Sequence, residues 1–390
     1  MNFDIVVIGA GPSGLCFAQA LAESGLRIAV LERQAECALA NPAFDGREIA
    51  LTHYSAKLMR ELGLWQRIAP NAVSPLRDAR VLNGASLYAM QIDHHDSQQN
   101  ELGFLISNYL IRKAAYEAVK ASPAITLMTN VEISKVSTNH AGASITLKNG
   151  EVIEAQLMVA ADSRFSETRR AMGIAANMHD FGKTMMVCVM EHEIEHQHIA
   201  WEWFDYGQTL ALLPMNGLRS SVVVTLPALD IANFMALPEA EFNKAIETRF
   251  KHRLGAMRLT STRHAYPLVT VYSDRFVANR FALVGDAAVG MHPVTAHGFN
   301  FGLRSANTLA NEIKAAQARD SNIAAADLLA RFEKTHKHAT RPLFMATHAI
   351  AKFYSNDTLP ARLIRHATLR IGNRILPFKR AVANMLTEAR

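Results

Sequence analysis

The sequence predicts an α/β protein in which a parallel sheet flanked by helices is interrupted by an antiparallel sheet and followed by C-terminal helices. Three observations support this class. A strand, a glycine turn and a helix open the chain, strand-like segments fill the middle from about 183 to 271, and a second strand followed by a glycine and an acid begins near 281. An antiparallel sheet inserted in an open α/β fold produces this order.

The opening strand and helix enclose a Gly-x-Gly-x-x-Gly motif. A β-branched apolar run at 3–8 precedes the motif, and residues 15–23 have the pattern of a helix. Gly9 allows the tight turn, Gly11 lets the backbone approach a pyrophosphate, and Gly14 lets the helix pack close to the strand. The helix N-terminus adds free N–H groups and a positive dipole end that attract the anion. The predicted dinucleotide contacts here are Gly9, Gly11, Pro12, Ser13 and Gly14.

An acidic residue completes this pattern. The apolar run 27–31 predicts a second strand and ends on Glu32, about twenty residues beyond the glycines. A carboxylate at this position can accept the hydroxyls of an adenosine ribose. We include Glu32 and its neighbour Arg33 in the predicted site.

The composition narrows the class further. A chain of 390 residues, 49% of them hydrophobic, suffices for two to three domain-sized units with a sizeable core. Cys16, Cys37 and Cys188 form no Cys-x-x-Cys pair, which argues against a zinc site or a disulfide framework and fits a reducing cytosol. No apolar stretch reaches the roughly eighteen residues of a membrane span, and the N-terminus has the pattern of a core strand rather than a signal peptide. We therefore expect a cytoplasmic protein.

The net charge of +6 is concentrated towards the C-terminus. From Arg341 onward there are nine Lys or Arg residues and two Asp or Glu residues. Apolar and basic residues alternate at roughly helical spacing over 362–385, which predicts helices that either pack on the protein body or contact an anionic membrane surface or a partner in a biosynthetic complex. Because the tail has no aromatic interleaving and the chain has no recognised nucleic-acid module, we expect no nucleic-acid partner.

The remaining elements follow in order. Helices are predicted at 54–64 and 109–121, and a hairpin turns at Lys148-Asn149-Gly150, where Asn-Gly favours a type I′ turn. A buried strand at 157–161 ends on Asp162. The middle segment is predicted to contain a helix at 239–252 and strands at 185–190, 199–204, 209–213, 220–226 and 258–266.

A second glycine and acid motif follows the strand predicted at 281–284. Gly285 and Asp286 end that strand, and Gly298 begins a further helix. Asp286 can accept a hydroxyl of a ribityl chain, and the helix start can direct backbone N–H groups at a flavin ring or a pyrophosphate. The two motifs together predict that one dinucleotide is held at both ends.

With these motifs the chain resembles the FAD-dependent aromatic hydroxylases, the flavoprotein monooxygenases typified by p-hydroxybenzoate hydroxylase. The resemblance covers most of the chain and includes a third segment, 159–166 with Arg169, which is similar to the family's Asp-Gly motif but has Ser163 at the glycine. It implies a Rossmann-like FAD-binding domain of the glutathione-reductase type, an interleaved antiparallel-sheet substrate domain and C-terminal helices. It also implies that the helix beginning at Asn108 touches FAD, and adds these FAD contacts: Arg47, Arg112, Asp162, Gly285, Asp286, Pro293, Gly298, Phe299 and Asn300.

Within this family the chain is most similar to the ubiquinone-biosynthesis hydroxylases of the UbiH/UbiM type. The segment Arg47-x-Ile49-Ala50-Leu51-Thr52, the helix start at 298–304 and the basic C-terminus carry this likeness. His297 and Ser305 depart from the residues usual in relatives, which favours a divergent branch.

The resemblance implies a 5-demethoxyubiquinol-type hydroxylase. NADH or NADPH would reduce FAD, and a C4a-hydroperoxyflavin formed with O2 would hydroxylate the ring of an isoprenylated phenol or quinol. The protein would exclude water, hold the ring and help its hydroxyl release a proton. The inserted sheet should cover that cavity, with one of Trp201 and Trp203 facing the substrate. Further side chains of this sheet that suit an apolar aromatic substrate are Phe204, Tyr206, Met186 and Met190.

Histidines are the other candidate reactive groups. His292 and His297 lie nearest the predicted flavin edge and could assist proton transfer. His192 and His196 belong to a histidine- and glutamate-rich segment with the letters of a zinc site, but the segment lies between strands without helical context, so we predict a polar hairpin loop and no metal.

Alternatives remain open from sequence. The chain could reduce or desaturate an isoprenoid group, hydroxylate another phenol, or serve as an FAD-bearing scaffold, and Trp201-Glu202-Trp203 has the first part of a flavin-dependent halogenase motif. The predicted domains are a discontinuous FAD-binding domain at 1–75, 102–180 and 272–330, a substrate domain at 76–101 and 181–271, and a basic helical region at 331–390.

Overall fold

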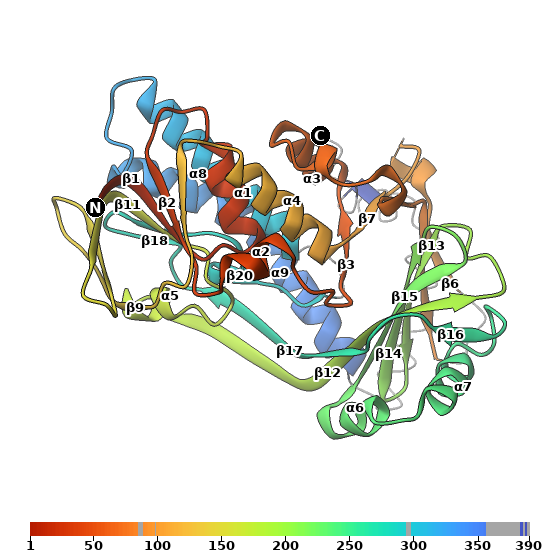
Figure 1. Ribbon diagram of the computed structural model, residues 1–390. Helices are drawn as coiled ribbons and strands as arrows, with labels where there is room; N and C mark the ends of the chain where they lie inside the picture. The colour runs from red at the N-terminus through yellow and green to blue at the C-terminus, as the bar shows by residue number, and fades with distance from the viewer. Residues whose placement is uncertain (85–88, 98, 294–297, 356–382, 385–386, 388–390) are drawn as a thin grey trace.

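A computed structural model gives the fold (Figure 1). It describes the chain except for residues 85–88, 98, 294–297, 356–382, 385–386 and 388–390. Two large sheets lie side by side, and a small third sheet lies near their junction.

The first sheet is mainly parallel, and helices cover it. Its central strands are buried on both sides, which explains their continuous apolar runs. The helices α1 (Pro12–Ala20), α4 (Asn108–Lys120) and α8 (Gly298–Gln317) pack together beside it, and α9 (Ala326–Ser355) packs against α8. The order β18-β19-β11-β1-β2-β8, with β10 and β9 beyond β11, comprises β1 (Asn2–Ile8), β2 (Ile28–Leu31), β8 (Ile125–Met128), β9 (Ile133–Thr138), β10 (Ala143–Leu147), β11 (Val152–Ala160), β18 (Val277–Ala278) and β19 (Phe281–Leu283).

The second sheet is mainly antiparallel. Figure 1 shows the long strands β12 and β17 running from the first sheet into the second. Two helices, α6 (Ala228–Met235) and α7 (Glu239–Arg249), cover its outer face. The order β20-β17-β12-β15-β14-β13-β5-β6, with β16 beside β12, comprises β5 (Asp78–Asn83), β6 (Ala89–Ile92), β12 (Ala176–His192), β13 (Ile199–Asp205), β14 (Gln208–Met215), β15 (Arg219–Pro227), β16 (Met257–Leu259), β17 (His264–Ser273) and β20 (Val289–Gly290).

The third sheet has the order β3-β7-β4 and lies next to the junction. Its strands are β3 (Glu48–Leu51), β7 (Gly103–Ser107) and β4 (Ser74–Leu76). The other elements are α2 (Glu36–Ala40), α3 (His53–Glu61), α5 (Glu167–Ala171), and the short turns η1 (Trp65–Arg67), η2 (Pro70–Ala72), η3 (His94–Ser97) and η4 (Gly285–Ala287).

The predicted fold class is confirmed, and three local predictions are wrong. The strand predicted at 258–266 is two strands, β16 and β17. The loop from His192 to Ile199 is not a hairpin, because β12 and β13 are separated by β15 and β14. At the β10–β11 turn only Gly150 has a positive φ, 87°, and its N–H donates to the Leu147 carbonyl, so the turn is not type I′, which needs two such residues.

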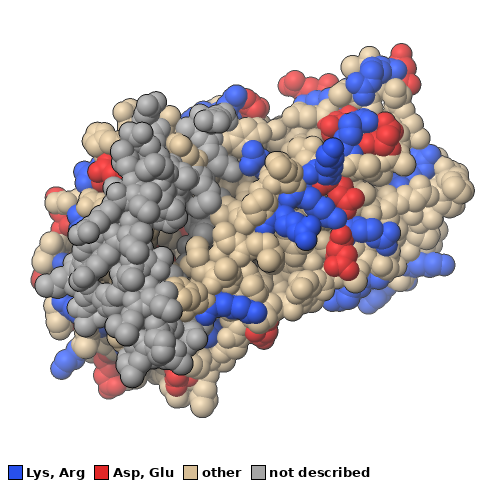
Figure 2. Space-filling model, turned by 180° about the vertical axis from the view of Figure 1, so that it is seen from behind, with Lys and Arg blue, Asp and Glu red and all other residues tan. Residues whose placement is uncertain are grey.

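The charged surface is mixed where the structure describes it. Figure 2 shows Lys and Arg side chains beside Asp and Glu on one face of the molecule. Among the described residues, Arg258 forms an ion pair with Glu191. Most of the basic tail predicted at 362–385 lies outside the described residues. Among the described helices, none is long and apolar enough to cross a membrane.

Candidate active site

A cavity of about 700 Å³ is lined by the turns that follow β1, β2 and β11 of the first sheet and by strands of the other two sheets. It reaches from the glycine turn after β1 to the inner face of the second sheet. Of the predicted site residues, those lining it are Gly9, Gly11, Pro12, Ser13, Glu32, Arg47, Arg112, Asp162, Asp286, His292, Pro293, Gly298 and Phe299. Gly14, Arg33, Gly285 and Asn300 do not line it, and His297 lies outside the described residues.

The first glycine turn fits tightly against β11. A Cβ on Gly9, whose φ is 105°, would lie 2.6 Å from the Ala161 carbonyl oxygen. A Cβ on Gly14 would lie 2.1 Å from the Gly9 carbonyl oxygen. At Gly11 a Cβ would meet nothing closer than 4.0 Å, so its backbone is open to the cavity. The turn thus exposes the N-terminus of α1 to an anion, as the motif predicts.

The carboxylate of Glu32 is held in place by the backbone. Its Oε2 accepts a hydrogen bond of 2.8 Å from the Ala10 N–H, and its Oε1 accepts one of 2.8 Å from the Gln34 N–H. These bonds fix its direction at the cavity wall, and a carboxylate keeps further lone pairs for hydroxyl donors.

Asp162 lies beside the same glycine turn, since a Cβ on Gly9 would lie 2.9 Å from its Cα, and it has an unsatisfied acceptor. Its Oδ2 accepts from the Thr168 N–H at 3.1 Å, whereas its buried Oδ1 has no hydrogen-bond partner in the described structure. The next residue, Ser163, has a φ of 109°, a conformation that favours glycine. This backbone conformation is the physical reason that a glycine suits the position, and serine occupies it in this chain.

The two glycine motifs meet in space. A Cβ on Gly285 would lie 2.6 Å from Ser13 Oγ, and a Cβ on Gly302 would lie 2.4 Å from the same atom. Ser305 Oγ accepts from the Gly285 N–H at 2.9 Å and donates to the Gly302 carbonyl at 2.7 Å. Ser305 therefore joins the turn after β19 to α8.

Asp286 and Arg164 form an ion pair at the cavity wall. Arg164 Nη2 lies 2.9 Å from Asp286 Oδ2, and Arg164 Nη1 donates to the Val269 carbonyl at 3.0 Å. The second oxygen of Asp286 stays available for a hydroxyl, so this pairing is compatible with a ribityl contact.

Arg47 belongs to a network with Asp45, Asn108 and Tyr266, and the sequence did not predict the part of Asp45 and Tyr266 in it. Its Nη2 lies 2.6 Å from Asp45 Oδ2, which also accepts from Asn108 Nδ2 at 2.7 Å. The Arg47 guanidinium lies 5.3 Å from the ring centroid of Tyr266, whose hydroxyl donates to the Asp45 carbonyl. Burial alone would raise the pKa of Asp45, but the charge of Arg47 and these hydrogen bonds outweigh it and lower the pKa. The network holds Arg47 at the cavity.

Asn300 has a structural contact. Its Oδ1 accepts from the Thr52 N–H at 3.2 Å, and its Nδ2 donates to the Ala50 carbonyl at 2.8 Å. These bonds fasten the end of β3 to α8. Its predicted contact with FAD stays a prediction.

The inner face of the second sheet forms the far wall of the cavity. Trp201, Trp203, Met186 and Met190 instead lie on the opposite face and pack in the core that α6 and α7 cover, so the expectation that one of the tryptophans faces substrate is wrong. Tyr206 packs against Gly84 and does not line the cavity either. The inner face contributes Met185, Val187, Glu202, Phe204, Thr209, Ala211, Leu213, Ser221, Val223 and Thr225.

Two half-buried carboxyl groups, Glu48 and Glu202, line this cavity, and neither was predicted. Burial raises the pKa of Glu48 to about 7, against the opposing effect of a hydrogen bond from Ser107. Burial raises the pKa of Glu202 to about 8. The strand alternation at 199–205 places Glu202 on the face opposite to the two tryptophans, but it does not tell which of the two faces lines the cavity.

His292 lines the cavity as a neutral imidazole. Burial, and then the charges of His348, Lys183 and Arg164, lower its pKa to about 4. Its ring lies 4.8 Å from that of Phe181. At neutral pH His292 therefore carries no positive charge, and its predicted role in proton transfer stays a prediction.

The histidine-rich segment satisfies the backbone. His192 Nδ1 bonds to the Ile194 carbonyl at 3.0 Å and His196 Nε2 to the Met215 carbonyl at 2.8 Å. Among the described residues, the one group that could hold a metal ion is Asp93, His94 and His95, where His94 Nδ1 already lies 2.7 Å from Asp78.

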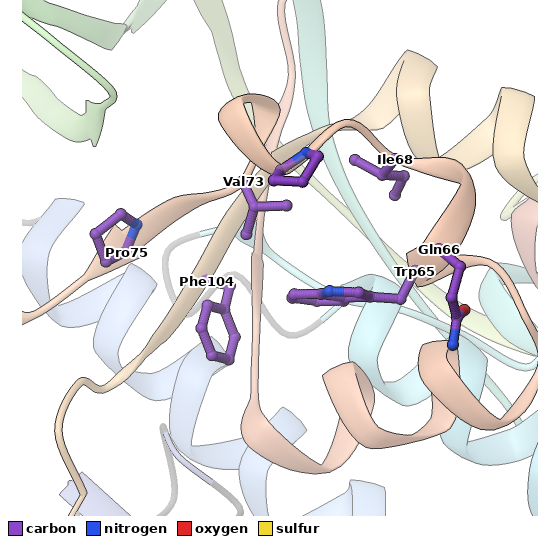
Figure 3. Close-up of a pocket in the computed structure, with 7 residues that line it drawn as sticks. Trp65, Gln66, Ile68, Val73, Pro75 and Phe104 are labelled. Atoms are coloured by element: carbon purple, nitrogen blue, oxygen red, sulfur yellow. The ribbon is translucent and has the colours of Figure 1, made fainter.

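A second hollow, of about 400 Å³, lies away from this site beside β4 and β7. In Figure 3 the rings of Trp65 and Phe104 lie below the side chains of Val73 and Ile68. Its lining includes no ionisable side chain, so it offers no acid or base for chemistry.

Sequence comparison identifies relatives over almost the full length. A family model for an FAD binding domain matches residues 2–342. The chain is 44% identical to ubiquinone hydroxylase UbiM of Neisseria meningitidis, over 99% of this chain and 85% of the relative. It is 34% identical to ubiquinone hydroxylase UbiL of Rhodospirillum rubrum, over 97% and 87%.

Solved structures have the same fold. The p-nitrophenol 4-monooxygenase PnpA of Pseudomonas putida superposes with a TM-score of 0.80 at 18% identity, over 100% of this chain and 99% of that one. PqsL of Pseudomonas aeruginosa, in complex with 2-aminobenzoylacetate, superposes with a TM-score of 0.78 at 20% identity, over 95% and 100%.

Proposed function

The chain belongs to the FAD-dependent monooxygenases that include the ubiquinone hydroxylases, and from this premise we propose that it hydroxylates the ring of an isoprenylated phenol or quinol in ubiquinone biosynthesis. We propose NADH or NADPH as electron donor and O2 as the oxygen source, as is usual in this family.

The observation that carries the proposal is the continuity of the cavity. One end presents the α1 N-terminus and the carboxylates of Glu32 and Asp286, while the other end is the largely apolar face of the second sheet. A dinucleotide with a reactive ring fits the first end, and an aromatic substrate with an apolar tail fits the second. The unsatisfied Oδ1 of Asp162 further supports a cofactor with hydroxyl donors.

The residues have separable roles in this proposal. FAD, when bound, supplies the redox and oxygen-activating chemistry. Glu32 accepts ribose hydroxyls, the α1 N-terminus stabilises the pyrophosphate, and Asp286 accepts a ribityl hydroxyl. Arg47, held by Asp45 over Tyr266, adds a positive charge near the junction of the two ends. The apolar wall excludes water from the reacting ring.

We also propose the domain division predicted from sequence and a contact of the basic C-terminal region with an anionic membrane surface. The excess of Lys and Arg after Arg341 supports such a contact. It would bring the cavity near a substrate that resides in lipid.

The test is NAD(P)H oxidation and product mass with FAD-reconstituted protein, a short-chain demethoxyubiquinol or polyprenylphenol, and oxygen. A product heavier by one oxygen is expected, and its oxygen should derive from labelled O2. Substrate-stimulated oxidation without oxygen insertion would instead favour an isoprenoid reductase, and absence of any stimulation would favour an FAD-bearing scaffold.

A further inference from the structure

We propose that Glu202 is a catalytic residue that binds the ring hydroxyl of the substrate and accepts its proton. This inference rests on the proposed hydroxylase function. It concerns a residue of the second sheet that no family motif includes.

The sheet register places Glu202 in the middle of the apolar wall. Glu202 pairs with Ala211 on β14, Ala211 pairs with Val223 on β15, and Val223 pairs with Val187 on β12. All four side chains line the cavity in one row. Glu202 is the one carboxyl group that β12 to β15 contribute to the lining within the described chain.

Glu202 has no partner in the protein. In the part of the chain that the structure describes, no hydrogen bond or ion pair to its carboxyl group is found, although Trp201 and Trp203 on either side of it are buried. Glu202 is half-buried and lines the cavity, so a molecule bound there can reach its carboxyl group, and a carboxyl group between apolar neighbours gains from such a partner. A ring hydroxyl has the donor and acceptor capacity to satisfy it.

The surroundings of Glu202 suit it to a phenol. Titratable groups line the same cavity from β3 (Glu48), β12 (Lys183) and β17 (Tyr266), as do Arg47 and His292. The register partners of Glu202 on β5 and β14, Val81 and Ala211, are apolar. Burial is the sole cause that raises the pKa of Glu202 to about 8.

This value brings the carboxyl group close to a phenol in acidity. A phenol ionises near pH 10, so proton transfer to Glu202 is uphill by about two pH units, against more than five for an ordinary glutamate. A carboxyl group whose pKa lies this close to the pKa of its proton donor can act as a base near neutral pH.

The proton moves from the substrate hydroxyl to Glu202 and later returns. The substrate O–H bond breaks, its proton moves to a Glu202 oxygen, and the electron pair stays on the ring oxygen. This pair enriches the ring carbons towards the electrophilic oxygen. When the hydroxylated ring regains aromaticity, its C–H proton leaves to solvent and the Glu202 proton returns to the ring oxygen, which restores the carboxylate.

The test compares wild type with Glu202→Gln in the FAD-bound protein. Glu241→Gln is the matched control, because Glu241 is an exposed residue of α7 on the other side of the same sheet. The probes are a short-chain 2-prenylphenol and its methyl ether, which lacks the hydroxyl proton. Binding is followed by the change in flavin absorbance, and hydroxylation by product mass.

We expect wild type and the control to bind the phenol about tenfold more tightly than the ether, whereas a second variant, Glu202→Leu, which has no hydrogen-bonding group, should bind both about equally. Glu202→Gln should lower the hydroxylation rate by about 100-fold at pH 7, because a general base contributes at least this much. The wild-type rate should rise through an inflection near pH 8, and Glu202→Gln should lack that inflection.

Different results would overturn the role of Glu202 and the proposed function. If wild type hydroxylates the phenol, Glu202→Gln retains the rate and the pH profile, and Glu202→Leu retains the preference over the ether, the role of Glu202 is overturned while the proposed function stands. If FAD-bound wild type neither binds nor hydroxylates any phenol, the proposed function is overturned and the role of Glu202 with it.

Discussion

The half-buried carboxyl group of Glu202 should make the stability of the protein depend on pH, and Glu202→Gln should remove the part of that dependence that Glu202 causes. The pKa of Glu202 is raised from 4.5 to about 8 in the folded protein. Between these values the folded protein holds a proton that the unfolded chain has released. Because the unfolded state binds fewer protons in this window, the free energy of unfolding falls as pH rises through it.

The magnitude follows from the proton difference. Each pH unit in the window costs about 1.4 kcal/mol, so the wild type should lose about 3 kcal/mol relative to Glu202→Gln between pH 5 and pH 7. Groups common to both proteins cancel in this comparison. Glutamine keeps the size of the side chain and cannot ionise, so its own contribution is nearly independent of pH.

The assay is urea unfolding of wild type, Glu202→Gln and the Glu241→Gln control at pH 5, 6 and 7, with equal FAD present. The difference in unfolding free energy between Glu202→Gln and wild type should grow with pH, and that of the control should not. Parallel pH curves for Glu202→Gln and wild type would refute the reasoning, because they would mean that Glu202 ionises in the folded protein as readily as in the unfolded chain.

Three further predictions concern the cofactor turns. Ser163→Gly should raise the free energy of unfolding by about 1 kcal/mol, since residue 163 has a φ of 109°; an unchanged urea midpoint would contradict this. Gly9→Ala should abolish FAD retention after gel filtration, because its Cβ would lie 2.6 Å from the Ala161 carbonyl oxygen, whereas Gly25→Ala, with a positive φ but nothing within 4 Å, should retain FAD. Asp286→Ala should weaken FAD retention by removing a ribityl acceptor, and a flavin content equal to that of wild type would count against that contact.

A fourth prediction concerns the basic C-terminal tail. Removing residues after Ser355 keeps α9 intact and should reduce sedimentation with anionic vesicles but not with neutral ones. Unchanged sedimentation with anionic vesicles would leave the tail only a packing role.

Local sequence patterns were sufficient for the cofactor end of the cavity. Gly9 has a positive φ, which favours glycine, and the carboxylate after β2 accepts a hydrogen bond from the same turn. Both residues can therefore be recognised within one segment of about thirty residues. The second motif at Gly285 was recognisable for the same reason. What these motifs did not contain was their meeting at Ser13, which depends on the parallel pairing of β11 with both β1 and β19.

The substrate end was decided by tertiary structure. The alternation of residues along 199–205 separates Trp201 and Trp203 from Glu202 and Phe204, but both faces of the strand are rich in large side chains, so the sequence alone does not say which face is inside. The packing of α6 and α7 settles it, because these helices cover the tryptophan face and leave Glu202 to the cavity. The sequence by itself therefore determined the fold class and the glycine turns, since these depend on backbone conformation and local periodicity. Only the tertiary structure decided which side chains face the substrate, since that depends on which elements distant in the chain cover each face.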